Sequence, residues 1–218
     1  VIQAALDYLA EEHEKPQLIV VGVYGPHFPY VAPKALYEKY FARATVPETF
    51  HDTPVYMNSI LRAMQNPGVT EEKVRGAVAA YCGLIEQMDT DLGRVWQAFD
   101  AYTRRKGSEG IFCYLSDHGD QVGDRGIFGK DTFFEKSAKI PLLFAGSGIP
   151  AGGCVREPVS ILDIGPTLWD LTGSEALPDY DGISLSAALS GEVQESDRTV
   201  ACEHLHQIDG RDVYGLML

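Results

Sequence analysis

The most informative segment of the chain is residues 110–130, which read GIFCYLSDHGDQVGDRGIFGK. It begins with a short apolar run, Ile111–Leu115, whose length and aromatic and branched side chains predict a β-strand. The run ends at Asp117 and His118, and four glycines then punctuate what we expect to be a flexible loop. An aspartate and a histidine therefore lie where a buried strand meets a loop. In open α/β sheets, ligands bind at this carboxyl end of the strands.

Three side chains of this segment have a chemistry of their own. Asp117 and His118 offer one carboxylate oxygen and one imidazole nitrogen, a workable pair of metal ligands. Lys130 ends the loop and carries a compact positive charge suited to an anion such as sulfate or phosphate. The alternative is that Asp117 and Asp120 are turn formers and His118 is a solvated loop residue. The preceding strand, the glycines and the trailing lysine favour a binding site over that alternative.

A second junction of strand and loop lies near the start of the chain. Residues 18–23 (LIVVGV) form a continuous apolar run, as expected for a strand buried on both faces. The following segment reads YGPHFP, and its two prolines exclude a helix around His27. A histidine at the end of a buried strand can point into the same cleft as Asp117, although a lone histidine in such a loop is more often an ordinary loop residue.

The remaining elements follow from apolar periodicity and capping. The clearest helix is predicted over 71–104, because Thr70 is a suitable N-cap, two glutamates favour the first turn and apolar residues recur at helical spacing. Further helices are expected at 1–12, 33–41, 54–64, 133–138, 161–173 and 186–189, and further strands at 140–144, 199–203 and 213–218. This order of strands and helices predicts an α/β sandwich with a mainly parallel sheet.

Four segments together resemble the sulfatase family, within the alkaline-phosphatase-like superfamily. Residues 116–144 (SDHGDQVGDRGIFGKDTFFEKSAKIPLLF) are similar to the family's metal loop, substrate lysine and next strand. Residues 21–33 (VGVYGPHFPYVAP) look like its Pro-His-x-Pro segment, and residues 81–95 and 160–173 are similar to two of its helices. The Asp-His pair and PHFPYVAP look most like the choline-sulfatase-like, arylsulfatase-type and phosphonate-monoesterase-like branches.

This resemblance implies an alkaline-phosphatase-like α/β fold, in which helices sandwich a mainly parallel sheet. The sheet is expected to be incomplete at the N-terminus and to be followed by the start of a small C-terminal sheet. We accordingly expect residues 1–191 to form part of the family's catalytic domain and residues 192–218 to begin a C-terminal subdomain. The chain begins in mid-pattern at Val1 and ends on an apolar run, so it looks like a piece of a longer protein.

Roles for single residues also follow from the resemblance. Asp117 and His118 would supply part of the shell of a divalent metal. The family favours calcium, and manganese and zinc stay open because histidine is a less usual calcium ligand. Lys130 would hold the oxygens of the ester, and His27 would bind the same anion or protonate the leaving group.

The family's nucleophile has no counterpart in this sequence. Sulfatases use a formylglycine made from the Cys or Ser of a C/S-x-P-S-R segment, and no cysteine or serine of the chain has that setting. We therefore expect the formylglycine in a missing N-terminal part. The 218-residue segment alone should then be inactive and bind metal weakly.

Composition narrows the class of partner. The net charge of −13 argues against nucleic acid and against an anionic membrane surface, so an anionic substrate must be attracted by a local positive site. No apolar run reaches membrane-spanning length. Oligomeric state and compartment, cytoplasmic or periplasmic, cannot be read from these residues.

The four cysteines show no C-x-x-C spacing, which argues against a zinc ribbon or a redox motif. Cys82 and Cys113 are expected to be small buried residues, and a disulfide between Cys154 and Cys202 stays open. A second group that looks like a metal cluster is formed by Glu203, His204 and His206. We expect these three residues to lie in an exposed loop instead.

The sequence thus predicts a metal-dependent sulfuric ester hydrolase that acts on a small-molecule or saccharide sulfate ester. Two alternatives remain. One is a phosphonate monoesterase or phosphodiesterase of the same superfamily, which an Asp-His pair fits equally well. The other is a non-catalytic, sulfatase-like binding module that has lost the nucleophile.

Overall fold

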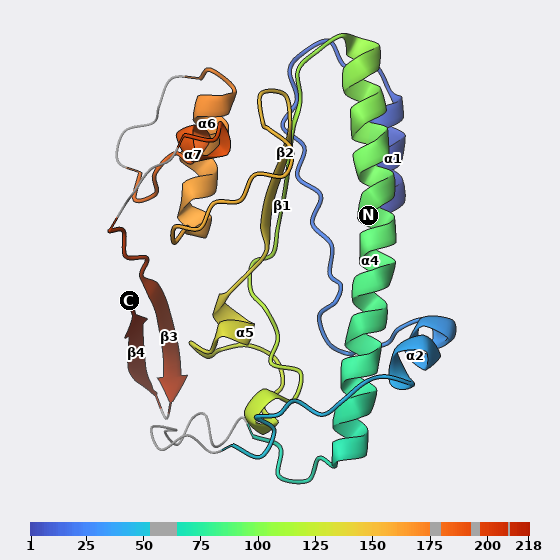
Figure 1. Cartoon of the computed structure of the whole chain (residues 1–218), viewed down its shortest axis with the longest axis vertical. Helices are drawn as coiled ribbons and strands as arrows, with labels where there is room; N and C mark the ends of the chain where they lie inside the picture. Colours follow the sequence, from blue (N-terminus) through green and yellow to red (C-terminus); the bar gives the residue numbers. More distant parts are fainter. Residues whose placement is uncertain (53–64, 175–179, 193–196, 209) are drawn as a thin grey trace. The chain divides into compact units, whose positions relative to one another are not determined.

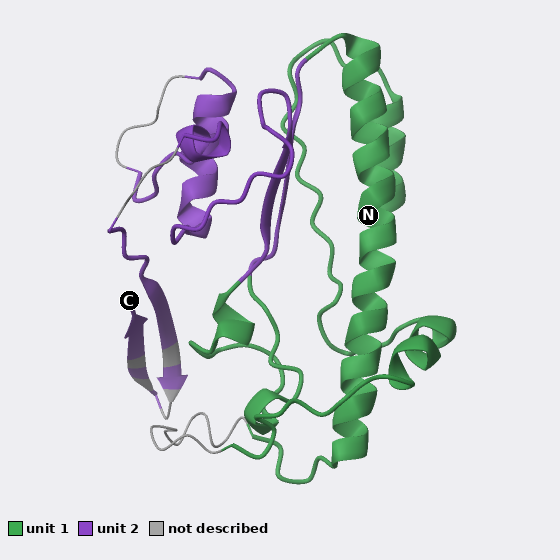
Figure 2. Cartoon of the chain, viewed as in Figure 1, with its two compact units in different colours: residues 1–108, 118–139 green, residues 109–117, 140–218 purple. Residues whose placement is uncertain are grey.

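The computed structural model of the chain describes residues 1–52, 65–174, 180–192, 197–208 and 210–218. The chain divides into two compact units, shown in different colours in Figure 2. Unit 1 comprises Val1–Ser108 and His118–Lys139, and unit 2 comprises Glu109–Asp117 and Ile140–Leu218. The helix predicted over 54–64 lies outside the described residues. None of the described helices has the length and apolar character needed to cross a membrane.

Unit 1 is built on one long helix, α4 (Glu71–Lys106), which confirms the helix predicted over 71–104 (Figure 1). Thr70 caps its N-terminus by accepting a hydrogen bond from the Lys73 N–H at 3.4 Å. Two glutamates lie in the first turn and three basic residues in the last, as the helix dipole favours. Gly107 ends the helix in the left-handed conformation at φ 61°, which glycine adopts without steric cost.

Two shorter helices of unit 1 pack against α4, namely α1 (Ile2–Ala10) and α2 (Lys34–Phe41). Near the C-terminal end of α4, the Arg105 guanidinium donates to the Leu9 carbonyl at 3.1 Å and so fixes the end of α1. Near the other end, Arg75 donates to the carbonyl of Ala44, just beyond α2. The helices predicted at 1–12 and 33–41 are therefore present with slightly shorter bounds.

Unit 2 contains two separate pairs of strands. β1 (Ile111–Leu115) pairs with β2 (Leu142–Gly146), and β3 (Cys202–Ile208) pairs with β4 (Arg211–Met217). Both pairs are antiparallel, with Cys113 opposite Phe144 in the first. Among the described residues the expected mainly parallel sheet is not seen. The reason is local, because the segment between β1 and β2 holds only η1 (Asp124–Gly126) and the four-residue α5 (Glu135–Ala138), with no crossover helix.

The helical part of unit 2 is organised by one buried carboxylate. A short 3₁₀ turn, η2 (Ile161–Asp163), leads into α6 (Ile164–Leu171), and α7 (Ser186–Leu189) follows. Asp163 is fully buried and completes a capping box with Ser160. Arg198 donates two hydrogen bonds to the Asp163 carboxylate, at 2.7 and 2.8 Å. The Ile183 N–H donates to the same group at 2.9 Å, so one side chain joins three segments.

The buried strand predicted at residues 18–23 is not present. In this segment Leu18 and Val20 are 82% and 85% exposed rather than buried. A strand needs a hydrogen-bonding neighbour, and no described segment pairs with this run. The apolar content of the segment predicted a strand, but it carries no information about which other strand would pair with it.

Two smaller expectations are also corrected. Glu203, His204 and His206 lie in strand β3 rather than in a loop. Successive strand residues point to opposite faces, so Glu203 and His204 do not converge on one ion. All four cysteines are free thiols, so Cys154 and Cys202 do not form a disulfide, and Cys82 and Cys113 are half-buried rather than fully buried.

Candidate anion-binding and metal site

The glycine-rich segment after β1 is a compact, buried turn rather than a flexible loop. The Gln121 N–H donates to the Gly129 carbonyl and the Gly123 N–H to the Ile127 carbonyl, both at 2.8 Å. Ile127 and Gln121 are almost completely buried. Because these backbone groups are paired inside the segment, its backbone can be buried without losing these hydrogen bonds. These hydrogen bonds therefore fix the backbone just before Lys130, the residue that follows the turn.

Two glycines allow this packing. A Cβ atom at Gly119 would lie 2.0 Å from the carbonyl oxygen of Lys136, and the Gly119 N–H donates to the Ser137 carbonyl at 2.8 Å. Gly123 has φ +90°, and a Cβ atom there would lie 2.6 Å from the Val74 side chain on α4. Both positions exclude larger residues because backbone or helix occupies the space.

One carboxylate gathers the donors of this turn. Asp120 accepts hydrogen bonds from the backbone N–H groups of Val122 and Gly129, both at 3.0 Å. The Tyr30 hydroxyl lies 2.8 Å from each Asp120 oxygen. Burial first, and the Asp120 carboxylate second, raise the pKa of Tyr30 above its usual range, so this hydroxyl keeps its proton and stays a donor. Asp120 is a turn former, but one bonded to a residue ninety positions away.

His27 and Lys130 lie side by side. The Lys130 Nζ atom is 3.0 Å from His27 Nε2, although 103 positions separate the two residues. His27 Nδ1 lies 2.8 Å from the Phe28 carbonyl oxygen, which can only accept, so we assign the proton of the neutral ring to Nδ1. Nε2 then carries the lone pair that accepts from the lysine ammonium.

His118 belongs to the same cluster, and a backbone carbonyl determines its tautomer in the same way. Its ring centroid is 6.1 Å from that of His27. Its Nδ1 lies 2.8 Å from the Gly119 carbonyl oxygen, which assigns the proton of the neutral ring to Nδ1 and the ring lone pair to Nε2. Unit 1 therefore brings together His27, Lys130 and His118, three of the four residues that the sequence singled out.

The fourth predicted residue, Asp117, ends the unit 2 segment and is the covalent neighbour of His118. Its side chain is exposed. Carboxylate oxygens and imidazole nitrogens are both donors that a divalent metal takes. Within the described residues no group of three or more His, Cys, Asp or Glu side chains could complete the shell. The chemistry of these two donors thus fits a divalent metal in kind.

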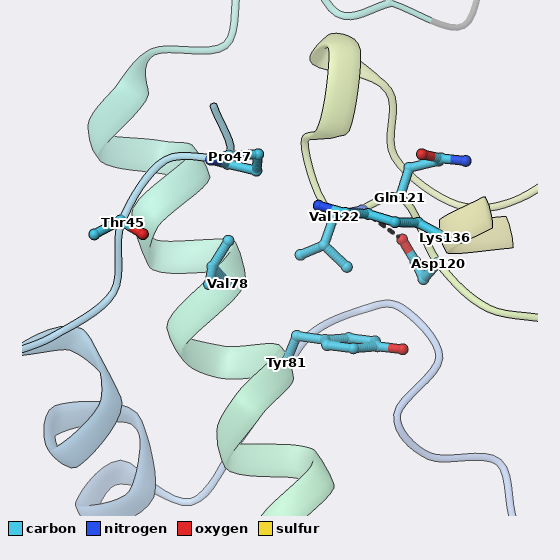
Figure 3. A pocket seen from close by; sticks show the side chains of 8 residues that line it. All are labelled: Thr45, Pro47, Val78, Tyr81, Asp120, Gln121, Val122 and Lys136. Atoms are coloured by element: carbon cyan, nitrogen blue, oxygen red, sulfur yellow. Dashed lines mark hydrogen bonds between the residues drawn. The ribbon is translucent and has the colours of Figure 1, made fainter. Parts of the chain in front are cut away.

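A pocket of about 310 Å³ adjoins the turn on the side of α4. Figure 3 shows Val78 and Tyr81, from α4, facing Asp120 and Val122 of the turn. The Tyr81 ring meets Tyr30 edge to face, with centroids 5.8 Å apart and an interplanar angle of 88°. Helix α4 therefore packs, through Tyr81, against Tyr30, the residue whose hydroxyl bonds Asp120.

Sequence reasoning missed the connection between Tyr30 and Asp120. It gave Tyr30 no role in the site, and considered Asp120 only as a turn former. The available signal was position, because Tyr30 comes three residues after His27 and Asp120 two residues after His118. Each is close in sequence to a candidate site residue.

Comparison with known proteins gives a consistent result. A family model described as Sulfatase matches residues 1–174. The choline-sulfatase of Rhizobium meliloti (strain 1021) is 36% identical over 83% of this chain and 37% of its own length. The multifunctional alkaline phosphatase superfamily protein PehA of Trinickia caryophylli is 30% identical over 97% of this chain and 44% of its own length.

Among solved structures, the phosphonate monoester hydrolase of Agrobacterium radiobacter matches 95% of this chain and 45% of its own chain. The TM-score is 0.75 at 27% sequence identity. The chain spans less than half the length of each of these three relatives.

Proposed function

The chain belongs to the sulfatase family, and we propose from this premise that the whole protein is a metal-dependent sulfuric ester hydrolase. The observation that carries the proposal is the 3.0 Å approach of Lys130 Nζ to His27 Nε2 beside His118. In a chain of net charge −13, such a pair is a local site where an anionic ester can bind.

In this proposal Lys130 and His27 share the anionic head of the ester. An ammonium group has three N–H donors, and the bond to His27 uses one of them, so Lys130 can also donate to ester oxygens. Positive charge held in place before the reaction stabilises the charge that develops in the transition state. His27 would bind the same anion or protonate the leaving oxygen as an imidazolium, which requires a proton taken up at Nε2 in place of the bond from Lys130.

Asp117 and His118 would hold part of the shell of a divalent metal. Such an ion, when bound, would polarise the anionic oxygens of the ester. We propose calcium from the family resemblance, with manganese or zinc as alternatives that a histidine ligand accommodates. Metal analysis of the purified protein in its full encoded length would identify the ion, and chelation should abolish activity.

We propose that the nucleophile, a formylglycine, lies in a part of the protein outside this chain. Support comes from the lack of a C/S-x-P-S-R segment in the 218 residues and from the chain's spanning less than half of each relative. The protein in its full encoded length should hydrolyse an aryl sulfate, and the 218-residue segment alone should not. Turnover by the segment alone would refute this division of the site.

A second candidate is phosphonate monoester hydrolysis, favoured by the similarity to the Agrobacterium radiobacter enzyme. A sulfate monoester and a phosphonate monoester present similar anionic oxygens to His27 and Lys130, so the geometry fits both. Matched aryl sulfate and aryl phosphonate substrates with the same leaving group separate them. A higher kcat/KM for the sulfate supports the first candidate, and the reverse order supports the second. A protein that binds inorganic sulfate but turns over neither ester would be a binding module.

A further inference from the structure

We propose that Tyr30 and Asp120 form a latch that positions Lys130 against His27. This inference rests on the proposed function, since it assigns the latch to the same anion site. Neither residue is placed to touch the ester in our account. Both act through Lys130 and His27, and are therefore positioning residues.

The contacts close a ring. Tyr30 follows His27 by three residues, and its hydroxyl lies 2.8 Å from both Asp120 oxygens. Asp120 accepts from the Gly129 N–H at 3.0 Å, and the next residue is Lys130. Lys130 Nζ then returns to His27 Nε2 at 3.0 Å. Two segments about a hundred positions apart are thus joined at two points, one outside the site and one inside it.

The latch also has a rigid support on each side. The Tyr30 ring packs edge to face against Tyr81 of α4. On the other side, Asp120 accepts from the N–H of Val122, a β-branched residue held at φ 44°. That conformation is rare for valine and persists only where the surroundings impose it. A strained backbone bonded to Asp120 indicates that the turn is built around this carboxylate.

The alternative is that Tyr30 and Asp120 only stabilise the fold. A long, flexible lysine side chain does not need its backbone fixed in order to reach an anion in water. However, an ammonium group that must hold one anion together with a particular imidazole loses affinity when its backbone is free to shift. The two readings differ in whether the contact between Lys130 and His27 depends on the Tyr30 hydroxyl.

The test uses the Tyr30→Phe variant of the protein in its full encoded length, with ¹⁵N-labelled histidine. The Nε2 signal of His27 is recorded without ligand at about pH 8.5, where an ordinary imidazole is neutral. A His27→Gln variant assigns the signal, and Lys130→Met defines its position without the lysine. Tyr8→Phe is the matched control, since it removes a hydroxyl that donates to the exposed Gln17.

We expect Tyr30→Phe to move the His27 Nε2 signal toward the Lys130→Met position and Tyr8→Phe to leave it in place. The dissociation constant for inorganic sulfate should rise by up to roughly tenfold in Tyr30→Phe, the limit set by the hydrogen bond to the charged Asp120 that no longer holds Lys130 in position. The KM for the ester should rise by a similar factor, with kcat changed less. Asp120→Asn should show the same signature and serves as the second variant if Tyr30→Phe does not fold.

Three outcomes contradict the latch. The first is an unchanged His27 signal in both variants. The second is a signal that moves equally in Tyr8→Phe. The third is a sulfate affinity that stays within twofold in a protein whose wild type binds sulfate. If the wild type binds no sulfate and hydrolyses no ester, the proposed function fails, while the ligand-free His27 signal still decides whether the latch holds the pair.

Discussion

At the scale of single residues, the account depends on side chains whose chemistry is set by one or two neighbours. The carbonyl of the following residue fixes the tautomer of both His27 and His118, and so determines which ring nitrogen carries the lone pair. The same reasoning separates Lys130, which bonds His27, from Lys139, whose ammonium is paired with Glu135 one helical turn away on the surface. Two lysines in different surroundings are therefore expected to respond differently to substitution.

Replacing Lys130 should remove most of the affinity for an anion. We expect Lys130→Met to weaken inorganic sulfate binding by roughly a hundredfold, because a charged donor to a bound anion is lost. Lys139→Met should change it less than twofold, since surface ion pairs contribute little. Isothermal titration calorimetry on the protein in its full encoded length provides the measurement. Equal effects of the two substitutions would contradict the role of Lys130.

The cysteines should differ sharply in reactivity. Burial in strand β1 raises the pKa of the Cys113 thiol to about 11, so little thiolate forms there at pH 8. Cys154 is exposed and unbonded to other cysteines. We expect iodoacetamide at pH 8 to label Cys154 well before Cys113, as followed by peptide mass spectrometry over time. Labelling of both at one rate would mean that β1 is more open than described.

At the scale of elements, two sites hold segments in place. In unit 1, α4 supports the glycine-rich turn through close contact of Val74 with Gly123. In unit 2, Asp163 joins the start of α6 to the segments that carry Ile183 and Arg198. Each site can be tested by one conservative substitution and a matched control.

Asp163→Asn should strongly destabilise the chain. It breaks a buried ion pair and leaves the Arg198 guanidinium without its countercharge, a loss of about 3–5 kcal/mol in the free energy of unfolding. Asp170→Asn, which alters an exposed bond to Ser186, should cost less than about 0.5 kcal/mol. Urea unfolding at pH 7 followed by circular dichroism measures both values.

The same pair predicts a pH dependence. Burial alone would raise the pKa of Asp163, but bonds from Arg198 and from the Ser160 and Ile183 N–H groups outweigh it, so the pKa is lowered on folding. The stabilisation is then complete above the unfolded-state pKa of about 3.9 and is lost as the pH falls through the lower folded value. The difference in unfolding free energy between wild type and Asp163→Asn should therefore narrow below about pH 4. A gap that is constant from pH 7 to pH 3 would contradict the ion-pair account.

Two glycine substitutions in unit 1 should change the free energy of unfolding in opposite directions. Gly123→Ala places a methyl group against Val74 at a left-handed φ, and we expect it to cost about 1–3 kcal/mol. Gly93→Ala lies in α4 with open space around it and should stabilise by about 0.4–1 kcal/mol, since alanine favours helix. Thermal unfolding of both variants is sufficient. Equal shifts of the melting temperature would contradict the close packing at Gly123.

At the scale of the whole molecule, prediction succeeded where the information was local. The start of α4 was predicted from Thr70 and the two glutamates beside it, and the helix ends at Lys106, two residues beyond the predicted end. The strand predicted at 18–23 was wrong because a strand needs a hydrogen-bonded neighbour, and apolar character does not show whether one is present. The antiparallel return of β2 was missed because the predicted parallel sheet requires a crossover helix, which the segment between β1 and β2 does not form.

The candidate site shows the same division. Asp117, His118, His27 and Lys130 were predicted from local motifs and from resemblance to the sulfatase family; three of them meet in unit 1, and their roles stay a prediction. The contact of Tyr30 with Asp120 was not predicted, because it is one hydrogen bond between residues ninety positions apart. Such a contact leaves no periodicity or spacing in the sequence. The division of the chain at residue 191 stays a prediction.

The central claim, that His27 and Lys130 serve one anionic ester, is tested most directly by initial rates of sulfate release. The protein in its full encoded length would be assayed on an aryl sulfate as wild type, His27→Gln and Lys130→Met. The account predicts measurable release by wild type and a kcat/KM lower by about a hundredfold or more in each variant, because each removes a group acting on the transition state. Release at the wild-type rate by either variant, or no hydrolysis of aryl sulfate or aryl phosphonate by wild type, would contradict it.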